Sequence, residues 1–516
     1  MSKLTGQHPA LGGTVGGMFR DTVIGSPDAI AVRDGQVELT YRELNDRVNR
    51  LTAALTAQGL RKGDRVALLS ENCLGYVEVL LACAKGGFIA ACLNWRQTRR
   101  ELEASIALAD PGIIFTSPEF VDRCPAELPQ FGMGEPLDRL IAGYSAAEPE
   151  VEVASEDGLI ILYTSGTTGT SKGALVSHRA MIARGTLMRA DWSIRRSDGF
   201  IAWSPLFHMA SADPTLATLM QGGTVSVVSG FDPEAIVSSL TVHDVGWMVL
   251  MPGMIERLAT ELERCNEPLR RVACAGCMAN LVPADQIRKI SLLLNAPFLN
   301  SFGSSETGIA PASGNWIEPG ADIGDLGKRQ NSSCEIRLIG DDGQPVAPGQ
   351  VGEICLRGPL LFSGYWNDAE ATDKAFRDGW YHMGDAFYRD TAGNLHFADR
   401  KKYLIKSGGE NIYPAEIELL LRNIPGIHDA VVVKRTDRHW GEVPVAFVVA
   451  DADASGLTSK DVQDALAGKI ARYKLPKEIH LIRSEEIERN PTGKIRRDLL
   501  ERRAQTPVMI DKGTKP

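Results

Sequence analysis

A loop-like segment, YTSGTTGTSKG at Tyr163–Gly173, concentrates residue types that bind phosphate. Its glycines let backbone N–H groups converge, while its hydroxyls and Lys172 add hydrogen-bond donors and positive charge. It follows the apolar run 159–162 and precedes SHRAMIARGTLMRA, which is typical of a helix. A Walker loop is excluded, because that motif places its lysine directly after the second glycine, whereas Lys172 precedes Gly173. Composition alone is equally consistent with a flexible turn, so other motifs must decide.

Four further motifs follow along the chain: SFGSSETG at 301–308, YHMGD at 381–385, ADRKKYLIKSGGENIYPAEIE at 398–418 and NPTGK at 490–494. GSSETG differs from the G-x-S-x-G elbow of serine hydrolases, so that class of enzyme has no support. In this order and spacing, the five motifs resemble the adenylate-forming (AMP-binding) superfamily. Within it, the chain is similar to the acyl-CoA synthetases, the branch of fatty-acid and aryl-acid CoA ligases, from about residue 41 to residue 500.

The resemblance implies an ATP-dependent ligase. A carboxylic acid and ATP would give an acyl-adenylate and pyrophosphate, and coenzyme A would then give the thioester and AMP. Two anions meet in the first step, so the site needs cations and hydrogen-bond donors that screen both. ATP, Mg²⁺ and coenzyme A are the implied cofactors, and the acid is a small molecule. Two alternatives stay open: a stand-alone adenylation enzyme that loads a carrier-protein thiol, and a catalytically silent nucleotide-binding protein.

The resemblance also implies where ATP or AMP would bind. Asp385 matches the aspartate that accepts hydrogen bonds from the ribose hydroxyls, and Glu306, with Thr164, matches the ligands of Mg²⁺. Phe302 stands where the family often has tyrosine, and Ser305 where it more often has threonine. The full implied set is Thr164, Ser165, Gly166, Thr167, Thr168, Lys172, Phe302, Gly303, Ser305, Asp385, Arg400 and Lys494.

The implied catalytic residues are Lys494, Glu306 and His208. Lys494 would reach from the C-terminal domain to the substrate carboxylate and the α-phosphate, where its ammonium neutralises charge. His208 would gate the acyl pocket, although a lone histidine beside an apolar run is usually a core residue. Lys402 falls at the hinge that swings the C-terminal domain between two poses. The implied coenzyme A contacts are Gly408, Gly409, Lys406 and Lys474. The two lysines could equally well belong to a solvated basic face.

The acyl pocket is placed by rough alignment with the family. Mostly apolar walls favour a monocarboxylate with an apolar body, whether medium-chain, aryl or alicyclic. Asp213 would disfavour a second carboxylate if it faces the pocket. The segment 275–279 lacks the proline of the family's GGAPL-like turn, which leaves the shape of the pocket open. The implied lining residues are His208, Ser211, Asp213, Trp247, Met251, Gly276, Cys277 and Phe302.

The elements that position these residues follow from the hydrophobic pattern. Between residues 41 and 245, helical stretches alternate with short apolar runs such as RVALLS and GIIFTS, as in α/β layers. From about 325 to 397, short alternating runs punctuated by glycine and proline predict antiparallel hairpins without helices. Beyond Arg400, the pattern indicates a separate α+β module.

The predicted fold class is therefore α/β. The resemblance adds a large N-terminal domain of layered β-sheets flanked by helices, with a small β-barrel-like region, and a small, mobile α+β C-terminal domain. The expected organisation is an AMP-binding domain at 1–399 that holds the ATP and acyl pocket, a hinge at 400–402, and a C-terminal domain at 403–516 that carries Lys494.

Bulk composition excludes other classes. With 516 residues, 44% hydrophobic and a net charge of −9, the chain is ordinary and globular, and its acidic balance argues against nucleic-acid binding. The nine cysteines are odd in number and lie mostly in apolar runs, as reduced thiols do, and Cys274 and Cys277 predict core packing rather than zinc. We expect a cytoplasmic protein, because the chain shows neither a secretory signal nor a membrane-spanning run. A homodimer stays open.

Overall fold

The computed structural model describes residues 12–164, 172–324, 326–407, 410–451, 454, 456–467, 469–490 and 493–505. The chain forms two compact units, one of Met1–Ile336 with Leu356–Tyr381 and the other of Arg337–Cys355 with His382–Pro516. The predicted hinge at 400–402 falls inside the second unit, and the predicted domain boundaries stay predictions. The predicted site residues outside the described residues are Ser165, Gly166, Thr167, Thr168, Gly408 and Gly409.

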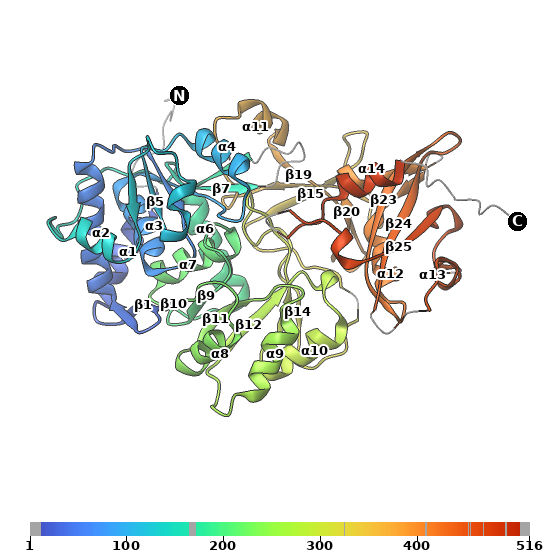
Figure 1. Ribbon diagram of the computed structural model, residues 1–516, viewed down its shortest axis with the longest axis horizontal. Coiled ribbons are helices and arrows are strands. Elements are labelled where there is room, and N and C mark those ends of the chain that lie inside the picture. Colours follow the sequence, from blue (N-terminus) through green and yellow to red (C-terminus); the bar gives the residue numbers. More distant parts are fainter. Residues whose placement is uncertain are drawn as a thin grey trace, which may run out of the picture. The chain divides into compact units, whose positions relative to one another are not determined.

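An eight-stranded sheet forms one layer of the first unit (Figure 1). Its strand order is β14-β13-β12-β11-β9-β10-β1-β2, parallel from β13 to β1 and antiparallel at both edges. Parallel sheets of this kind are covered on both faces, which explains their nearly continuous apolar runs. The bounds are β1 Ile30–Asp34, β2 Val37–Thr40, β9 Gly199–Ala202, β10 Val225–Val227, β11 Val245–Val249, β12 Val272–Cys277, β13 Phe298–Asn300 and β14 Trp316–Ile317.

A seven-stranded sheet forms another layer of the same unit, in the order β17-β8-β7-β4-β3-β5-β6. Pairing is parallel from β7 to β6, whereas β8 and β17 add antiparallel strands at one edge. Every residue of β4 and β5 is buried. The predicted α/β layers are confirmed. The bounds are β3 Arg65–Leu69, β4 Ile89–Cys92, β5 Ile113–Thr116, β6 Gln130–Gly132, β7 Gly158–Thr164, β8 Lys172–Ser177 and β17 Gly364–Tyr365.

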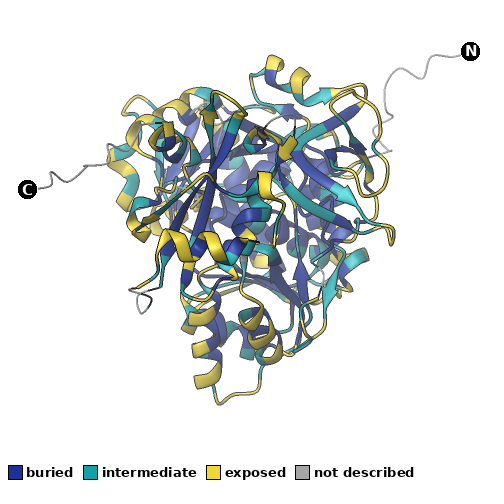
Figure 2. Ribbon diagram, turned by 90° about the vertical axis from the view of Figure 1, so that its right-hand side faces the viewer, coloured by how far each residue is buried: buried dark blue, intermediate teal, exposed yellow. Residues whose placement is uncertain are grey.

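Helices pack on these sheets, and some of them begin at a side-chain cap. Thr40 and Glu43 form a reciprocal capping box at the start of α2, and Thr98 and Glu101 form another at α4. Figure 2 shows buried strands together with helices that expose their outer turns. The bounds are α1 Val15–Gly25, α2 Tyr41–Ala57, α3 Leu74–Gly86, α4 Arg99–Ala109, α5 Glu135–Ile141, α6 His178–Trp192, α7 Met209–Gln221, α8 Pro233–Val242, α9 Ile255–Arg264 and α10 Ala284–Leu293.

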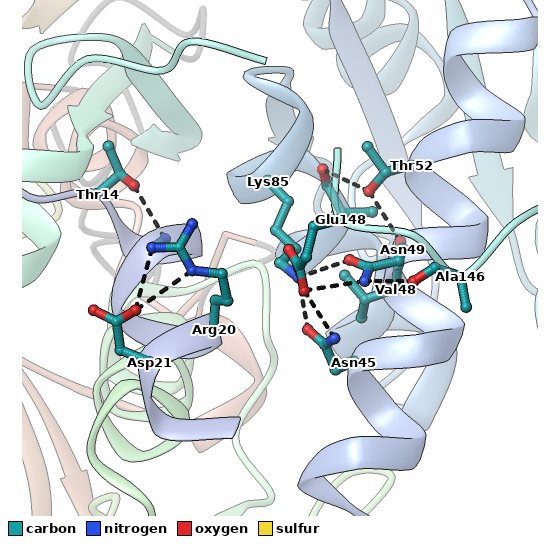
Figure 3. A network of polar contacts seen from close by, with 12 residues as sticks. Thr14, Arg20, Asp21, Asn45, Val48, Asn49, Thr52, Lys85, Ala146 and Glu148 are labelled. Atoms are coloured by element: carbon teal, nitrogen blue, oxygen red, sulfur yellow. Dashed lines mark hydrogen bonds and ion pairs between the residues drawn. The ribbon is translucent and has the colours of Figure 1, made fainter. Parts of the chain in front are cut away.

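A buried lysine joins three segments of the first unit (Figure 3). Lys85, in the almost fully buried helix α3, donates to Asn45 Oδ1 and Asn49 Oδ1 of α2, each at 2.6 Å, and lies 2.7 Å from Glu148 Oε2. Burial lowers the pKa of Lys85, and the ion pair with Glu148 opposes that shift. Asn45, Asn49 and Glu148 together accept the hydrogen bonds that the Lys85 ammonium can donate, so we regard this network as structural.

His178 makes the stability of the first unit depend on pH. It is fully buried at the start of α6, where its Nδ1 accepts the N–H of Val15 at 3.2 Å. Burial lowers the pKa of His178 from 6.5 to about 4, so the folded chain keeps the ring neutral where the unfolded chain protonates it. Stability that is fully present above about pH 6.5 is therefore lost as the pH falls toward 4, by about 3 kcal/mol in total.

The measurement is urea unfolding at pH 7, 5.5 and 4.5. His178→Asn, whose amide oxygen can accept the same N–H, should lose less stability on acidification than the wild type. Burial also lowers the pKa of His243 to about 4, so the acid loss should shrink rather than vanish. An unchanged pH dependence in the variant would contradict the assignment.

The region from 325 to 397 contains the predicted antiparallel hairpins and one helix that the sequence did not predict. β19 pairs antiparallel with both β18 and β20. The expectation of no helix was wrong, because Asp368 accepts the N–H of Ala371 and caps a short helix, α11. The bounds are β15 Glu335–Ile339, β16 Gly352–Arg357, α11 Ala369–Ala375, β18 Phe376–Arg377, β19 Trp380–Arg389 and β20 Leu395–Arg400.

The second unit contains a five-stranded sheet with helices on both faces. Its order is β22-β21-β24-β23, with β25 parallel to β24. One core cluster contains residues of α12 and α13, and another contains residues of α14, in agreement with the predicted α+β module. The bounds are β21 Ile405–Ser407, β22 Glu410–Ile412, α12 Pro414–Arg422, β23 Ile427–Asp437, β24 Gly441–Ala450, α13 Ser459–Leu466, β25 Glu478–Ile482 and α14 Arg497–Gln505.

All nine cysteines are free thiols, as predicted. Cys274 and Cys277 both lie in the buried strand β12, where burial raises the pKa of each thiol. They therefore serve as core residues. Among the helices that the structure describes, none has the length and apolar character needed to cross a membrane.

Candidate active site

The strands on either side of the glycine-rich segment, β7 and β8, form an antiparallel pair. Thr164 ends β7 and Lys172 begins β8, and the two residues pair directly across the strands. The hydroxyl of Thr164 lies 3.5 Å from the carbonyl oxygen of Lys172, which it can donate to. β8 separates the loop from helix α6, so the loop does not open a helix as a Walker loop does. The hairpin fixes the two ends of the loop, Thr164 and Lys172, beside each other.

Tyr365 contacts both a predicted phosphate ligand and the predicted magnesium ligand. The ammonium of Lys172 lies 4.8 Å from the centre of the Tyr365 ring, which is a cation–π distance. The hydroxyl of Tyr365 donates to Glu306 Oε1 at 3.0 Å. Burial, and to a lesser degree the neighbouring Glu306 carboxylate, raise the pKa of Tyr365, so the hydroxyl keeps its proton. Tyr365 belongs to none of the five motifs.

Glu306 stands in a tight turn built from SFGSSETG. The N–H of Gly308 donates to the carbonyl oxygen of Ser304 at 2.8 Å, with Gly308 in the left-handed region at φ +66°. Gly303 has no room for a side chain, since an added Cβ would lie 1.9 Å from the Gly308 oxygen. The carbonyl oxygen of Glu306 accepts the N–H of Phe362 at 2.9 Å. Backbone and side chain of Glu306 are thus both held.

Arg184, in α6, is buried and donates to three acceptors that are far apart in the sequence. Its guanidinium reaches Asp213 Oδ2 at 3.0 Å, the carbonyl oxygen of Leu360 at 3.0 Å and that of Ser305 at 3.1 Å. Its stem packs on Gly308, where an added Cβ would come within 2.7 Å. Burial raises the pKa of Asp213, and Arg184 opposes that shift. Arg184, which sequence analysis also missed, therefore fastens the SFGSSETG turn to α6 and α7.

The side-chain oxygens of Glu306 and Thr164 are of the kind that suits a magnesium ion brought by ATP. The carboxylate of Glu306 and the hydroxyl of Thr164 are hard oxygen ligands of the kind Mg²⁺ prefers. In the part of the chain that the structure describes, no group of three or more His, Cys, Asp and Glu side chains could hold a metal by itself. Mg²⁺ typically takes one or two carboxylates, and substrate phosphates and water complete its shell. A single buried glutamate, Glu306, agrees with that pattern.

Several predicted acyl-pocket residues lie at the carboxyl ends of neighbouring strands of the eight-stranded sheet. Met251 follows β11, Gly276 and Cys277 end β12, and Phe302 follows β13. These strands are parallel, and ligands of such sheets bind beyond the carboxyl ends of the strands. Gly276 is explained by packing, because an added Cβ would lie 2.2 Å from the Leu299 oxygen of the neighbouring strand.

The other predicted pocket residues lie in α7 and β11. His208 is the N-cap of α7 and is half-buried, with its ring 5.0 Å from that of Phe207. Ser211 and Asp213 are buried in the same helix, and Arg184 pairs with the carboxylate of Asp213. Trp247 packs its ring 4.7 Å from that of Trp192. Trp247 is thus part of the core, and its contact with a bound acid stays a prediction.

A buried lysine that sequence analysis missed lies at the same sheet edge. Lys328 is fully buried and donates to Asn300 Oδ1, which also accepts the N–H of Ala279 at 3.0 Å. Asn300 pairs with Cys277 across β12 and β13. Burial lowers the pKa of Lys328 to about 7. An isolated lysine in a loop carries no sequence signal of this burial, which arises only when the strands assemble.

In the second unit, the structure brings Asp385 and Arg400 together. They are directly opposite each other on the antiparallel strands β19 and β20, and Arg400 Nε lies 3.1 Å from Asp385 Oδ1. Asp385 is buried, whereas the side chain of Arg400 is 43% exposed. Cross-strand opposite charges stabilise such a pair and fix the orientation of both side chains. Their roles toward a nucleotide stay predictions.

Three predicted functional lysines beyond Arg400 have acidic or aromatic neighbours. Lys402, the predicted hinge residue, is exposed and lies 4.6 Å above the ring of Tyr403. Lys406 pairs with Asp341 at 3.5 Å. Lys474, another predicted coenzyme A contact, lies 2.7 Å from Glu416 Oε2. Binding of coenzyme A phosphates by Lys406 and Lys474 would therefore exchange existing ion pairs for new ones.

Lys494 lies in an exposed turn near the end of the described chain. The N–H of Lys494 donates to Asn490 Oδ1 at 2.9 Å, and the N–H of Asn490 donates to the Lys494 carbonyl oxygen at 2.8 Å. The turn holds the backbone, while the long side chain stands on the surface of the second unit. An exposed lysine is what a residue that reaches into another part of the molecule requires.

The chain matches two family models, AMP-binding enzyme over residues 19–366 and AMP-binding enzyme C-terminal domain over residues 416–494. It is 34% identical to feruloyl-CoA synthase of Amycolatopsis sp over 93% of this chain and 96% of that protein. It is 34% identical to indoleacetate–CoA ligase of Aromatoleum aromaticum over 92% and 94% of the two chains. Its fold matches that of O-succinylbenzoate coenzyme A synthetase from Bacillus subtilis in complex with ATP and magnesium ion, with a TM-score of 0.82, 27% identity, and coverage of 94% and 98%.

Proposed function

The chain belongs to the family of AMP-binding enzymes and is an AMP-forming acid–thiol ligase, and we propose that it joins an aromatic monocarboxylic acid to coenzyme A. The residues proposed for the reaction are Lys172 and Glu306 in the first unit, and Asp385, Arg400 and Lys494 in the second. The observation that supports this assignment is the gathering of Lys172 and Glu306 around Tyr365 at the end of the β7–β8 hairpin.

Adenylation joins two anions. A carboxylate oxygen attacks the α-phosphorus of ATP, a new oxygen–phosphorus bond forms, and the bond to the bridging oxygen breaks as pyrophosphate leaves. We propose that Lys494 neutralises the incoming carboxylate and the α-phosphate, while Lys172 binds the β- and γ-phosphates. Glu306 and Thr164 would hold Mg²⁺, which would supply positive charge that neutralises the phosphates of ATP. Asp385 accepts hydrogen bonds from the ribose hydroxyls, which fixes the nucleoside.

Thioester formation follows on the same acyl group. The thiol of coenzyme A loses its proton, its sulfur attacks the carbonyl carbon of the acyl-adenylate, and AMP leaves with the oxygen that bridged carbon and phosphorus. We propose that Lys406 and Lys474 meet the phosphates of coenzyme A, and that Lys402 lies at the hinge between two domain poses. A change of pose is needed because the same acyl group must react first with ATP and then with coenzyme A.

The choice of an aromatic monocarboxylate rests on the two relatives and on Asp213. Both relatives are named for an aromatic acid, and each is 34% identical to this chain over the aligned residues. Arg184 already pairs with Asp213 and donates to two carbonyl oxygens, so a second substrate carboxylate would have to compete with Asp213 for this cation. His208, Cys277 and Phe302 would line the pocket around the ring.

A panel of acids tests the proposed substrate. We expect AMP release from ATP and magnesium to require coenzyme A and to be at least about tenfold faster with arylacrylic and arylacetic acids than with aliphatic or dicarboxylic acids of the same length, since a pocket misfit of about 1–3 kcal/mol gives such a ratio. Equal rates with medium-chain fatty acids would contradict the aromatic assignment. Pyrophosphate exchange without a thioester would instead favour an enzyme that loads a carrier-protein thiol.

A further inference from the structure

We propose that Tyr365 is a positioning residue that holds the magnesium ligand Glu306 and the phosphate ligand Lys172 in one fixed arrangement. The inference rests on the proposed function, because that function gives Glu306 and Lys172 their roles. Tyr365 itself need not touch ATP. It would act through the two side chains that do.

One side chain makes the two contacts by different means. The hydroxyl of Tyr365 donates to Glu306 Oε1 at 3.0 Å, while the face of the same ring lies 4.8 Å from the Lys172 ammonium. The hydrogen bond turns one carboxylate oxygen toward Tyr365 and thereby sets the direction of the other. The ring face attracts the ammonium electrostatically and restricts a side chain that otherwise has many rotamers.

The backbone around Tyr365 is held by hydrogen bonds to α11 and to β8, the strand that carries Lys172. β17 pairs antiparallel with β8, where Tyr365 stands opposite Ala174. The N–H of Tyr365 donates to Thr372 Oγ1 at 2.9 Å, and the N–H of Trp366 donates to the Gly173 carbonyl oxygen at 2.7 Å. A residue anchored to the strand that carries Lys172 can transmit a fixed geometry to both ligands.

An aromatic neighbour also packs against the ring of Tyr365. The ring of Phe362 meets that of Tyr365 edge-on at 4.9 Å between centroids, and the N–H of Phe362 donates to the Glu306 carbonyl oxygen at 2.9 Å. Tyr365 therefore also has a packing role, which any large aromatic residue would fulfil. The hydroxyl separates the two roles, because phenylalanine retains the ring and its cation–π contact but has no donor for Glu306.

The test compares ATP binding with and without magnesium in three proteins: wild type, Tyr365→Phe and Tyr365→Leu. Isothermal titration calorimetry gives the Kd for ATP in EDTA and in excess Mg²⁺. For Tyr365→Phe, we expect an unchanged Kd in EDTA and a loss of about tenfold or more in the gain that Mg²⁺ brings, as for other groups that orient a metal ligand. For Tyr365→Leu, the Kd in EDTA should also rise, because Lys172 loses its aromatic contact.

Tyr388→Phe is the matched control, since that tyrosine stacks on His396 in the other unit and should leave both Kd values unchanged. Thermal unfolding checks that each variant is folded. A Tyr365→Phe protein with a wild-type magnesium effect would overturn the proposal, as would an equal rise of Kd in EDTA and in Mg²⁺. A wild-type protein that binds ATP independently of Mg²⁺ would refute the magnesium role of Glu306, and this proposal with it.

Discussion

Replacement of Lys494 by alanine is expected to lower acid-dependent ATP–pyrophosphate exchange by about a thousandfold. The adenylation step brings a carboxylate against the α-phosphate, and charge builds up between them as the bond forms. A mobile ammonium that arrives at this point neutralises that charge, and water is a poor substitute because it must reorganise. The exposed position of Lys494 on its turn is compatible with such a reach.

The second half-reaction provides the internal control for this variant. Thioester formation from a supplied acyl-adenylate and coenzyme A has no carboxylate–phosphate collision, so Lys494→Ala should retain most of that rate. Lys460→Ala, an exposed lysine of α13, should leave both half-reactions unchanged. Exchange activity within about threefold of the wild type would remove Lys494 from the mechanism, and parallel loss of both half-reactions would indicate a damaged fold instead.

Replacement of Arg184 by methionine is expected to lower the free energy of unfolding by about 3 to 5 kcal/mol. The side chains of Arg184 and Asp213 are each only 1% exposed, so the variant would leave the Asp213 carboxylate buried without its cation. The carbonyl oxygens of Leu360 and Ser305 would also lose their donor. Urea unfolding at pH 7 measures the loss.

A second substitution tests whether the uncompensated carboxylate causes that loss. Arg184→Met combined with Asp213→Leu should be more stable than Arg184→Met alone, because no charge is then left unpaired. Arg189→Met, at an exposed position of the same helix, should change stability by less than about 0.5 kcal/mol. A loss of less than about 1 kcal/mol for Arg184→Met would contradict this prediction, because the Arg184–Asp213 pair would then contribute no more than an exposed ion pair does.

The layered fold could be predicted because local pattern and burial agree. RVALLS and GIIFTS are short apolar runs that became β3 and β5, and the amphipathic stretch from Tyr41 became α2. β8 was missed because KGALVS lies between a glycine-rich loop and a helix and has no strong alternation of its own. Its strand conformation comes from pairing with β7 and β17.

The candidate site was predicted only where a motif carried it. Asp385 and Arg400 belong to motifs, and the structure places them opposite each other across two strands. Tyr365 and Arg184 belong to no motif that the sequence analysis used, and their partners Glu306 and Asp213 lie far away along the chain. A single sequence shows the residue types but not which distant side chain meets which, so contacts of this kind appear only after folding.

The course of the chain through the two units limits how relatives can be recombined. The second unit consists of Arg337–Cys355 and His382–Pro516. If only the residues after 402 were exchanged with a relative, this unit would combine segments from two different enzymes. A junction between 386 and 399 would split the β19–β20 hairpin and draw Asp385 and Arg400 from different enzymes. A functional chimera should instead inherit residues 337–355 together with everything from residue 382 onward. Each charged residue of that unit then keeps the ion-pair partner that it has in the parent enzyme.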